Sequence, residues 1–369
     1  MSALAVRRHT RRAAALVAAP LLVLGALLPA GGTAPRESPH TEVNASGQCT
    51  FNTQVIKGTP WSLQRILLDQ LWQDTKGKGV VVAVIDTGVD NRNPQLAEAV
   101  DPRLGRDFLD KKGNGTNDPV GHGTKVAGII AARPLKGTGF VGIAPEATIM
   151  PIRQNDNNNA GRADTMALAI EHAIAKGADV INISQNTTKP LMPDSKLALA
   201  VRKAVEEDVV VIASTGNDGA DGEARNTYPA SLPGVLAVGA SDRNNERAPF
   251  SQAGEFVGVA APGVDMVSTV PGSGHCVDNG TSFAAPYVAG VAALLRAKYP
   301  KWTNKNIIAR IEQTAQRTGL GHDRFIGWGV VDPVKALRDA EPITEPSPDT
   351  GFAERRADIS PAKLTVGET

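Results

Sequence analysis

A serine in the stretch "NGTSFAAPYVAG" (279–290) has the setting of a nucleophile. Ser282 follows Gly280 and Thr281 where an apolar helix is predicted to begin. A serine at such a position is most often an N-cap. However, Pro286 removes the N–H that would bond the Ser282 carbonyl, and a helix start offers N–H groups and a positive dipole end to a developing oxyanion. A cap and a nucleophile are therefore both open interpretations of this serine.

A nucleophilic serine needs a base and a group that orients the base. His122 lies in "GHGT" (121–124), between glycines that permit close backbone approach, at the start of another apolar helix. Asp86 ends the run "GVVVAVID" (79–86), and open α/β sheets bind ligands at the carboxyl ends of their strands. Alone, Asp86 is most simply a turn residue. Together with His122 and Ser282 it predicts an Asp–His–Ser set for nucleophilic catalysis.

A fourth segment offers a place to hold negative charge. "DVVVIASTGNDG" (208–219) leaves a buried strand and passes through Asn217, whose amide is predicted to be a donor to the oxyanion. By itself, the sequence Gly-Asn-Asp-Gly indicates only a turn. The four segments together are far more specific than any one of them.

The other histidines lack a comparable setting. Four of them are predicted to have no catalytic role, namely His9, His40, His172 and His322. His275, beside Cys276, would allow a metal site, but no further His/Cys cluster accompanies it. The polar loop 154–161 leaves a calcium site open, although it lacks EF-hand spacing. We therefore predict no cofactor and assign no metal ligands.

The elements that must position these residues alternate between strands and helices. Nearly continuous apolar runs, typical of strands buried on both faces of a parallel sheet, occupy 79–86, 178–184, 208–214 and 234–240. Helical patterns lie at 121–133, 165–177 and 195–208. This alternation predicts an α/β fold, a doubly wound and mostly parallel sheet flanked by helices.

Composition excludes some classes of function. The 369 residues include 39 basic and 38 acidic side chains, for a net charge of +1, so nucleic acid is not an expected partner. Aromatic residues make up only 4%, whereas 37 glycines imply many tight turns. This composition favours a compact enzyme over a binding module built on aromatic platforms.

The chain is predicted to have four parts. Residues 1–34 have the basic head, short apolar run and small residues of a secretory signal peptide, an uncleaved anchor being the alternative. Residues 35–60 form a polar arm, 61–340 the globular domain, and 341–369 a proline-containing tail with no apolar run long enough to cross a bilayer. The protein is therefore expected to be exported, to the cell envelope or the medium, and membrane association stays open.

The two cysteines, Cys49 and Cys276, are predicted to form a disulfide, because an even pair in an oxidising compartment is more often bonded than free. The bond would tie the arm to the loop before Ser282. A catalytic thiol is the alternative, but neither cysteine lies in a recognisable nucleophile setting.

The order Asp86, His122, Ser282, in "VIDTG", "GHGT" and "GTSFAAP", resembles the subtilisin-like serine proteases over residues 61–338. The resemblance implies that Ser282 attacks a peptide carbonyl, His122 transfers its proton, Asp86 orients His122, and Asn217 and the Ser282 N–H bind the oxyanion. It also implies that a peptide substrate adds as a strand between two walls. These walls contain Ser184, Gln185 and Asn186, and Ser214, Thr215 and Gly216. Gln185-Asn186 replaces the family's Leu-Gly, which predicts altered specificity.

Three further stretches resemble one branch of that family, the mycosins. They are "TPWSLQRI" (59–66), "NTYPASLPGVLAVGA" (226–240) and "GWGVVDPVKAL" (327–337). The resemblance implies a membrane-associated protease of an actinobacterial type VII secretion system, with an arm that wraps the catalytic domain and with secreted type VII proteins as substrates. The alternatives are a freely secreted degradative subtilase and a catalytically idle scaffold of a secretion complex.

Overall fold

The computed structural model describes residues 51–317, 319 and 321–338. The predicted signal peptide, most of the arm including Cys49, and the tail lie outside these residues. The signal peptide, the disulfide and the tail therefore stay predictions.

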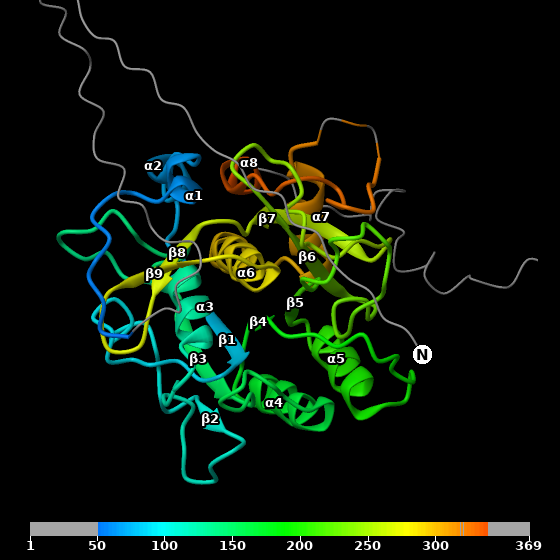
Figure 1. Cartoon of the computed structure of the whole chain (residues 1–369), viewed down its shortest axis with the longest axis horizontal. Helices are drawn as coiled ribbons and strands as arrows, with labels where there is room; N and C mark the ends of the chain where they lie inside the picture. The colour runs from blue at the N-terminus through cyan, green and yellow to red at the C-terminus, as the bar shows by residue number, and fades with distance from the viewer. Residues whose placement is uncertain (1–50, 318, 320, 339–369) are drawn as a thin grey trace, which may run out of the picture. The chain divides into compact units, whose positions relative to one another are not determined.

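A parallel sheet forms the centre of the fold (Figure 1). Its strands lie in the order β2-β3-β1-β4-β5-β6-β7, and all of its neighbouring pairs are parallel. The strands are β1 (Val81–Asp86), β2 (Arg106–Asp107), β3 (Thr148–Arg153), β4 (Val180–Ile183), β5 (Val210–Ser214), β6 (Val235–Ser241) and β7 (Val257–Pro262). β8 (Met266–Thr269) and β9 (His275–Asp278) form a separate antiparallel hairpin.

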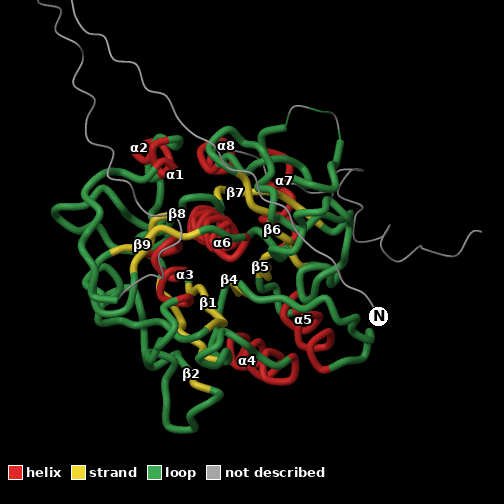
Figure 2. The backbone as a smooth tube through the Cα atoms, viewed as in Figure 1, coloured by secondary structure: helices red, strands yellow, loops and turns green. Residues whose placement is uncertain are grey.

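Helices cover both faces of the sheet. The helices are α1 (Trp61–Gln64), α2 (Leu68–Leu71), α3 (His122–Ala131), α4 (Ala163–Ala175), α5 (Lys196–Glu206), α6 (Thr281–Lys298), α7 (Asn304–Thr314) and α8 (Pro333–Leu337). α3 and α6 lie against one face, and α4 and α5 lie against the other (Figure 2).

The strand sequences explain this arrangement, because alternate residues of a strand point to opposite faces. In β1, Val82 and Val84 pack with the cluster that contains α3 and α6, whereas Ala83 and Ile85 pack with α4 and α5. Both sets are fully buried, so a continuous apolar run is needed. The α/β fold with a doubly wound, mostly parallel sheet is thus confirmed.

The four predicted strands are the central part of the sheet, and the strands that the sequence did not indicate lie beside them. In β3, Pro151 interrupts the apolar run and argues against a strand. The proline is tolerated because its outer neighbour β2 is only two residues long and pairs with Ile152 and Arg153, beyond Pro151. The β8–β9 hairpin leads directly into α6.

Candidate active site

The strand order brings three candidate segments to one edge of the sheet. β1, β4 and β5 are neighbours and parallel, so their carboxyl ends meet. Asp86 ends β1, residues 184–186 follow β4, and Asn217 stands three residues after β5. In the chain, β1 is followed by β3 and later by β4, and these two strands lie on opposite sides of β1 in the sheet. The strand order therefore reverses at β1, and open α/β sheets bind ligands at such a point.

Asp86 and His122 form a close pair. The His122 Nδ1 atom lies 2.7 Å from the Asp86 Oδ1 atom, which also accepts a 2.7 Å bond from the Thr87 N–H. Asp86 is fully buried and the His122 side chain is 12% exposed. Burial alone lowers the pKa of His122, but the charge and hydrogen bond of Asp86 and the charge of Asp118 raise it above its ordinary value of 6.5. The imidazolium is therefore stabilised at this site.

Asp118, which sequence reasoning missed, holds the loop that carries His122. Its buried carboxylate accepts bonds from the Gly121 N–H (2.8 Å), the Thr124 N–H (2.8 Å), and the hydroxyls of Thr124 (2.5 Å) and Thr87 (2.7 Å). These bonds connect the end of β1 to the first turn of α3. Burial raises the pKa of Asp118 above its ordinary value even though these bonds lower it.

Ser282 is the second residue of α6, and the N-cap of that helix is Gly280. Gly280 has φ +151° and ψ 155°, a conformation open essentially only to glycine. The N-cap interpretation of Ser282 is therefore wrong. The Ser282 hydroxyl instead donates to the Ser184 carbonyl (3.1 Å), and the Ser184 hydroxyl donates to the Ser282 carbonyl (2.9 Å). The second bond satisfies the acceptor that Pro286 leaves without its helical donor.

The Asn217 amide is held in one orientation by Thr281. The Asn217 Oδ1 atom accepts bonds from the Thr281 N–H and hydroxyl, both 3.0 Å long. The same hydroxyl accepts the Gly216 N–H at 3.1 Å. With its oxygen engaged, the exposed Asn217 side chain presents its NH₂ group at the start of α6. Thr281 belongs to the motif around Ser282, but its contact with Asn217 spans 64 residues of sequence, so no local pattern indicates this role.

The two predicted substrate walls face each other. A β-carbon at position 216 would stand 3.2 Å from both amide atoms of Asn186. Gln185 points to the loop 154–161 instead, accepting a 2.5 Å bond from Gln154 and donating a 3.2 Å bond to the Asn159 carbonyl. Ser214 and Thr215 are fully buried, so their side chains lie beneath the surface.

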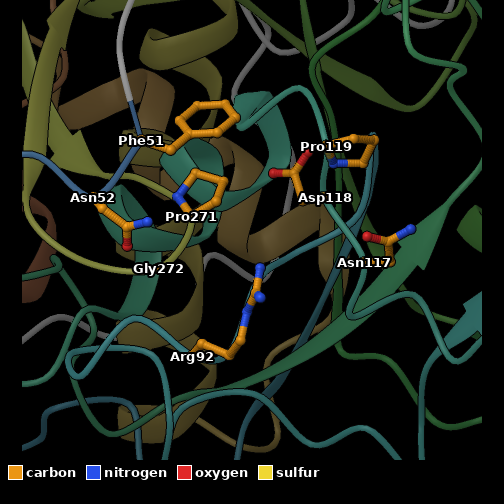
Figure 3. Close-up of a pocket in the computed structure, with 8 residues that line it drawn as sticks. All are labelled: Phe51, Asn52, Arg92, Asn117, Asp118, Pro119, Pro271 and Gly272. Carbon is orange, nitrogen blue, oxygen red and sulfur yellow. The ribbon is translucent and has the colours of Figure 1, made fainter.

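The described end of the arm reaches the loop that bears His122. A β-carbon at Gly121 would stand 2.6 Å from the Phe51 ring and 3.0 Å from Pro271. Figure 3 shows Phe51 and Pro271 lining a pocket with Asp118 on another side. This segment of the arm therefore packs against the neighbourhood of the candidate base.

His275 joins the arm to the domain. Its Nδ1 atom accepts the Ile56 N–H (3.1 Å), and its Nε2 atom lies 2.6 Å from the Gln95 Oε1 atom. Burial lowers its pKa to about 4, so the ring is neutral at pH 7. With both nitrogens engaged by protein groups, His275 has no lone pair left for a metal. Its neighbour Cys276 is half-buried on β9.

The parallel sheet and the helices on both of its faces are those of the subtilisin-like fold. The model of the subtilase family matches residues 77–329, and the chain belongs to that family. It is 39% identical over 283 residues to subtilisin E of Bacillus subtilis, covering 76% of this chain and 71% of that protein. The resemblance inferred from the motifs is confirmed.

Solved mycosin structures are also similar. The MycP3 protease from the type VII (ESX-3) secretion system is 35% identical with a TM-score of 0.68, covering 77% of this chain and 91% of that one. MycP1 from Mycobacterium smegmatis is 31% identical with a TM-score of 0.71, covering 88% of this chain and 92% of that one. The chain is thus a subtilase with mycosin neighbours. In the described part of the chain, no helix has the length and apolar character required to span a bilayer.

Proposed function

We propose that the protein is an exported serine endopeptidase of the mycosin type that cleaves peptide bonds through an acyl-enzyme. The observation that carries the proposal is the 2.7 Å contact between Asp86 and His122 at the edge of the sheet where Ser282 lies in the first turn of α6. Membership of the subtilase family supports the same chemistry.

The proposed reaction begins with proton transfer from Ser282 to His122. The Ser282 hydroxyl turns from the Ser184 carbonyl to the Nε2 atom of His122, which is unprotonated while Nδ1–H donates to Asp86. As Nε2 takes the proton, the Ser282 oxygen bonds to the substrate carbonyl carbon. Asp86 stabilises the imidazolium, which then protonates the leaving amine as the C–N bond breaks. Water, activated by the same histidine, hydrolyses the ester.

The tetrahedral intermediate carries an oxyanion that needs donors. The NH₂ group of Asn217 is proposed as one donor, because Thr281 occupies the oxygen of the same amide. The Ser282 N–H is the other, because an N–H in the first turn of a helix has no acceptor within that helix. The start of α6 would thus provide both the nucleophile and part of the oxyanion site.

The substrates are proposed to be proteins handled by a type VII secretion system. The similarity to MycP1, described as an essential component of the type VII (ESX-1) secretion system, supports this proposal. The proposed walls at 184–186 and 214–216 would hold the peptide, with Asn186 narrowing the space between them beside Gly216. The protein would act at the cell envelope or outside the cell.

A fluorophosphonate probe tests the chemistry. We expect a covalent adduct on Ser282 of the exported full chain, absent from Ser282→Ala and nearly absent from His122→Ala, with circular dichroism confirming that both variants fold. A folded chain that forms no adduct would contradict the protease proposal and favour a scaffold. Broad hydrolysis of casein, with no preference for type VII proteins, would favour a degradative subtilase instead.

A further inference from the structure

We propose that Lys125, held by Asp278 behind the Phe283 ring, is a positioning residue that sets the pH range in which His122 can accept a proton. The proposal rests on the proposed function of His122 and goes beyond the groups already placed in the site.

Lys125 is a lysine in an enclosed place. Its side chain is only 9% exposed, and its Nζ atom lies 2.6 Å from the Asp278 Oδ2 atom. A lysine is rarely buried unless a partner compensates its charge. Asp278 ends β9 and is 38% exposed, so the ion pair joins the hairpin to α3 at the boundary with solvent.

The Phe283 ring lies between the ion pair and His122 and contacts both Lys125 and His122. The Lys125 Nζ atom lies 5.4 Å from the centroid of Phe283, within the range of a cation–π contact. The His122 ring also lies beside Phe283, at 5.5 Å between centroids. Lys125 also stands three residues after His122 on α3, a spacing that places two side chains on adjacent helical turns. The ring is thus shared by the proposed base and a fixed cation.

Among the described residues, three charged side chains act on His122 from different segments. Asp86 at the end of β1 and Asp118 in the loop before α3 raise the pKa of the imidazole, whereas Lys125 on α3 lowers it. The two carboxylates alone would keep His122 protonated to higher pH, where it cannot accept a proton from Ser282. Lys125 therefore opposes them, and Asp278 moderates the effect of Lys125.

Paired substitutions separate this electrostatic role from a structural one. Lys125→Met leaves the Asp278 charge alone, so the acid limb of kcat/KM should move up by about half a pH unit, the size expected for a nearby unit charge under partial screening. Asp278→Asn removes a negative charge beside the Lys125 ammonium and should move the limb down, while the Oδ1 atom at position 278 still accepts the Asn279 N–H. The double variant should return close to the wild-type profile.

A matched control removes a lysine of the same charge elsewhere. Lys301→Met, at an exposed position after α6, should leave the acid limb in place. If both single variants shift the limb in the same direction, or lower kcat without shifting it, Lys125 has only a structural role and the proposal fails. If Lys125→Met does not fold, the acid limbs of Lys125→Gln and Asp278→Asn are compared instead, and we expect them to shift in opposite directions.

A second measurement does not require catalysis. The His122 ring can be titrated by NMR in the Ser282→Ala background, with His122→Ala assigning its signal. We expect the midpoint to rise with Lys125→Met and to fall with Asp278→Asn. If these shifts occur but the protein with Ser282 intact cleaves no peptide and binds no fluorophosphonate, the role of Lys125 is supported and the protease proposal is rejected. If the midpoints do not change and the protein with Ser282 intact is active, only the role of Lys125 is rejected.

Discussion

The side chain of Asn217 illustrates how single hydrogen bonds decide what a residue can do. Thr281 donates twice to its oxygen, and this fixes which end of the amide is left to face a substrate. An asparagine without such bonds could present either end. The oxyanion role proposed for Asn217 therefore depends on Thr281 as well.

Replacing Asn217 by alanine should lower kcat with little change in KM, because the donor acts on charge that develops only in the transition state. The expected loss is about 10²–10³-fold, the size known for removing a side-chain oxyanion donor from a subtilisin. Steady-state kinetics on a peptide substrate measure it. Asp218→Ala, at the adjacent exposed position, is the matched control and should have nearly wild-type kcat. An equal loss in both variants would indicate damage to the turn rather than a lost donor.

Some residues of the candidate active site could be predicted from the sequence, and others could not. Asp86, His122 and Ser282 could be proposed because each stands at the end of a recognisable strand or in the first turn of a helix, and Asn217 because it follows closely after a recognisable strand. Asp118 and Lys125 could not, because polar residues near a histidine are usually solvated. Asp278, which pairs with Lys125, is 153 residues away, and nothing local to either residue indicates this pair.

At the scale of the elements, the β8–β9 hairpin has two structural roles. It leads into α6, and through His275 it holds the arm, because the ring accepts the Ile56 N–H while the Gln54 carbonyl accepts the His275 N–H at 3.2 Å. The hairpin was not predicted, since β8 and β9 are four residues each and bear polar side chains. By contrast, the continuous apolar runs of β1, β4, β5 and β6 predict buried strands of a parallel sheet directly from the sequence.

The hold of His275 on the arm should weaken in acid. Burial lowers its pKa to about 4 in the folded protein, against 6.5 in the unfolded chain, so the unfolded state binds more protons between these values. The stability contributed by the neutral ring is therefore full above pH 6.5 and declines as the pH falls toward 4. We expect Tm to drop from pH 7 to pH 5, and to drop less in His275→Gln.

Hydrogen exchange locates that effect. The Ile56 amide should exchange faster at pH 5 than at pH 7 after correction for the intrinsic rate, whereas amides in β4 should not change. If the wild type and His275→Gln lose Tm equally between the two pH values, the neutral histidine is not what holds the arm.

Across the whole molecule, the predicted disulfide would secure the arm at a second point. Cys276 adjoins His275 on β9, while Cys49 lies two residues before the described arm, outside the described residues. Non-reduced mass spectrometry of the exported protein should find a peptide that links Cys49 to Cys276. Cys276→Ser should lower the free energy of unfolding by about 2–4 kcal/mol, the usual contribution of a disulfide. Thiol labelling of both cysteines in the non-reduced protein would contradict the prediction.

The reciprocal bonds between Ser184 and Ser282 join the proposed substrate wall to the helix that carries the proposed nucleophile. For protein engineering, this connection predicts that selectivity and turnover change together. A library that varies Gln185 and Asn186 while retaining Ser184 would leave the connection intact, whereas one that also randomises Ser184 would mix changes of preference with losses of rate. Ser184 is thus the position to hold constant when the enzyme is redesigned for a new peptide.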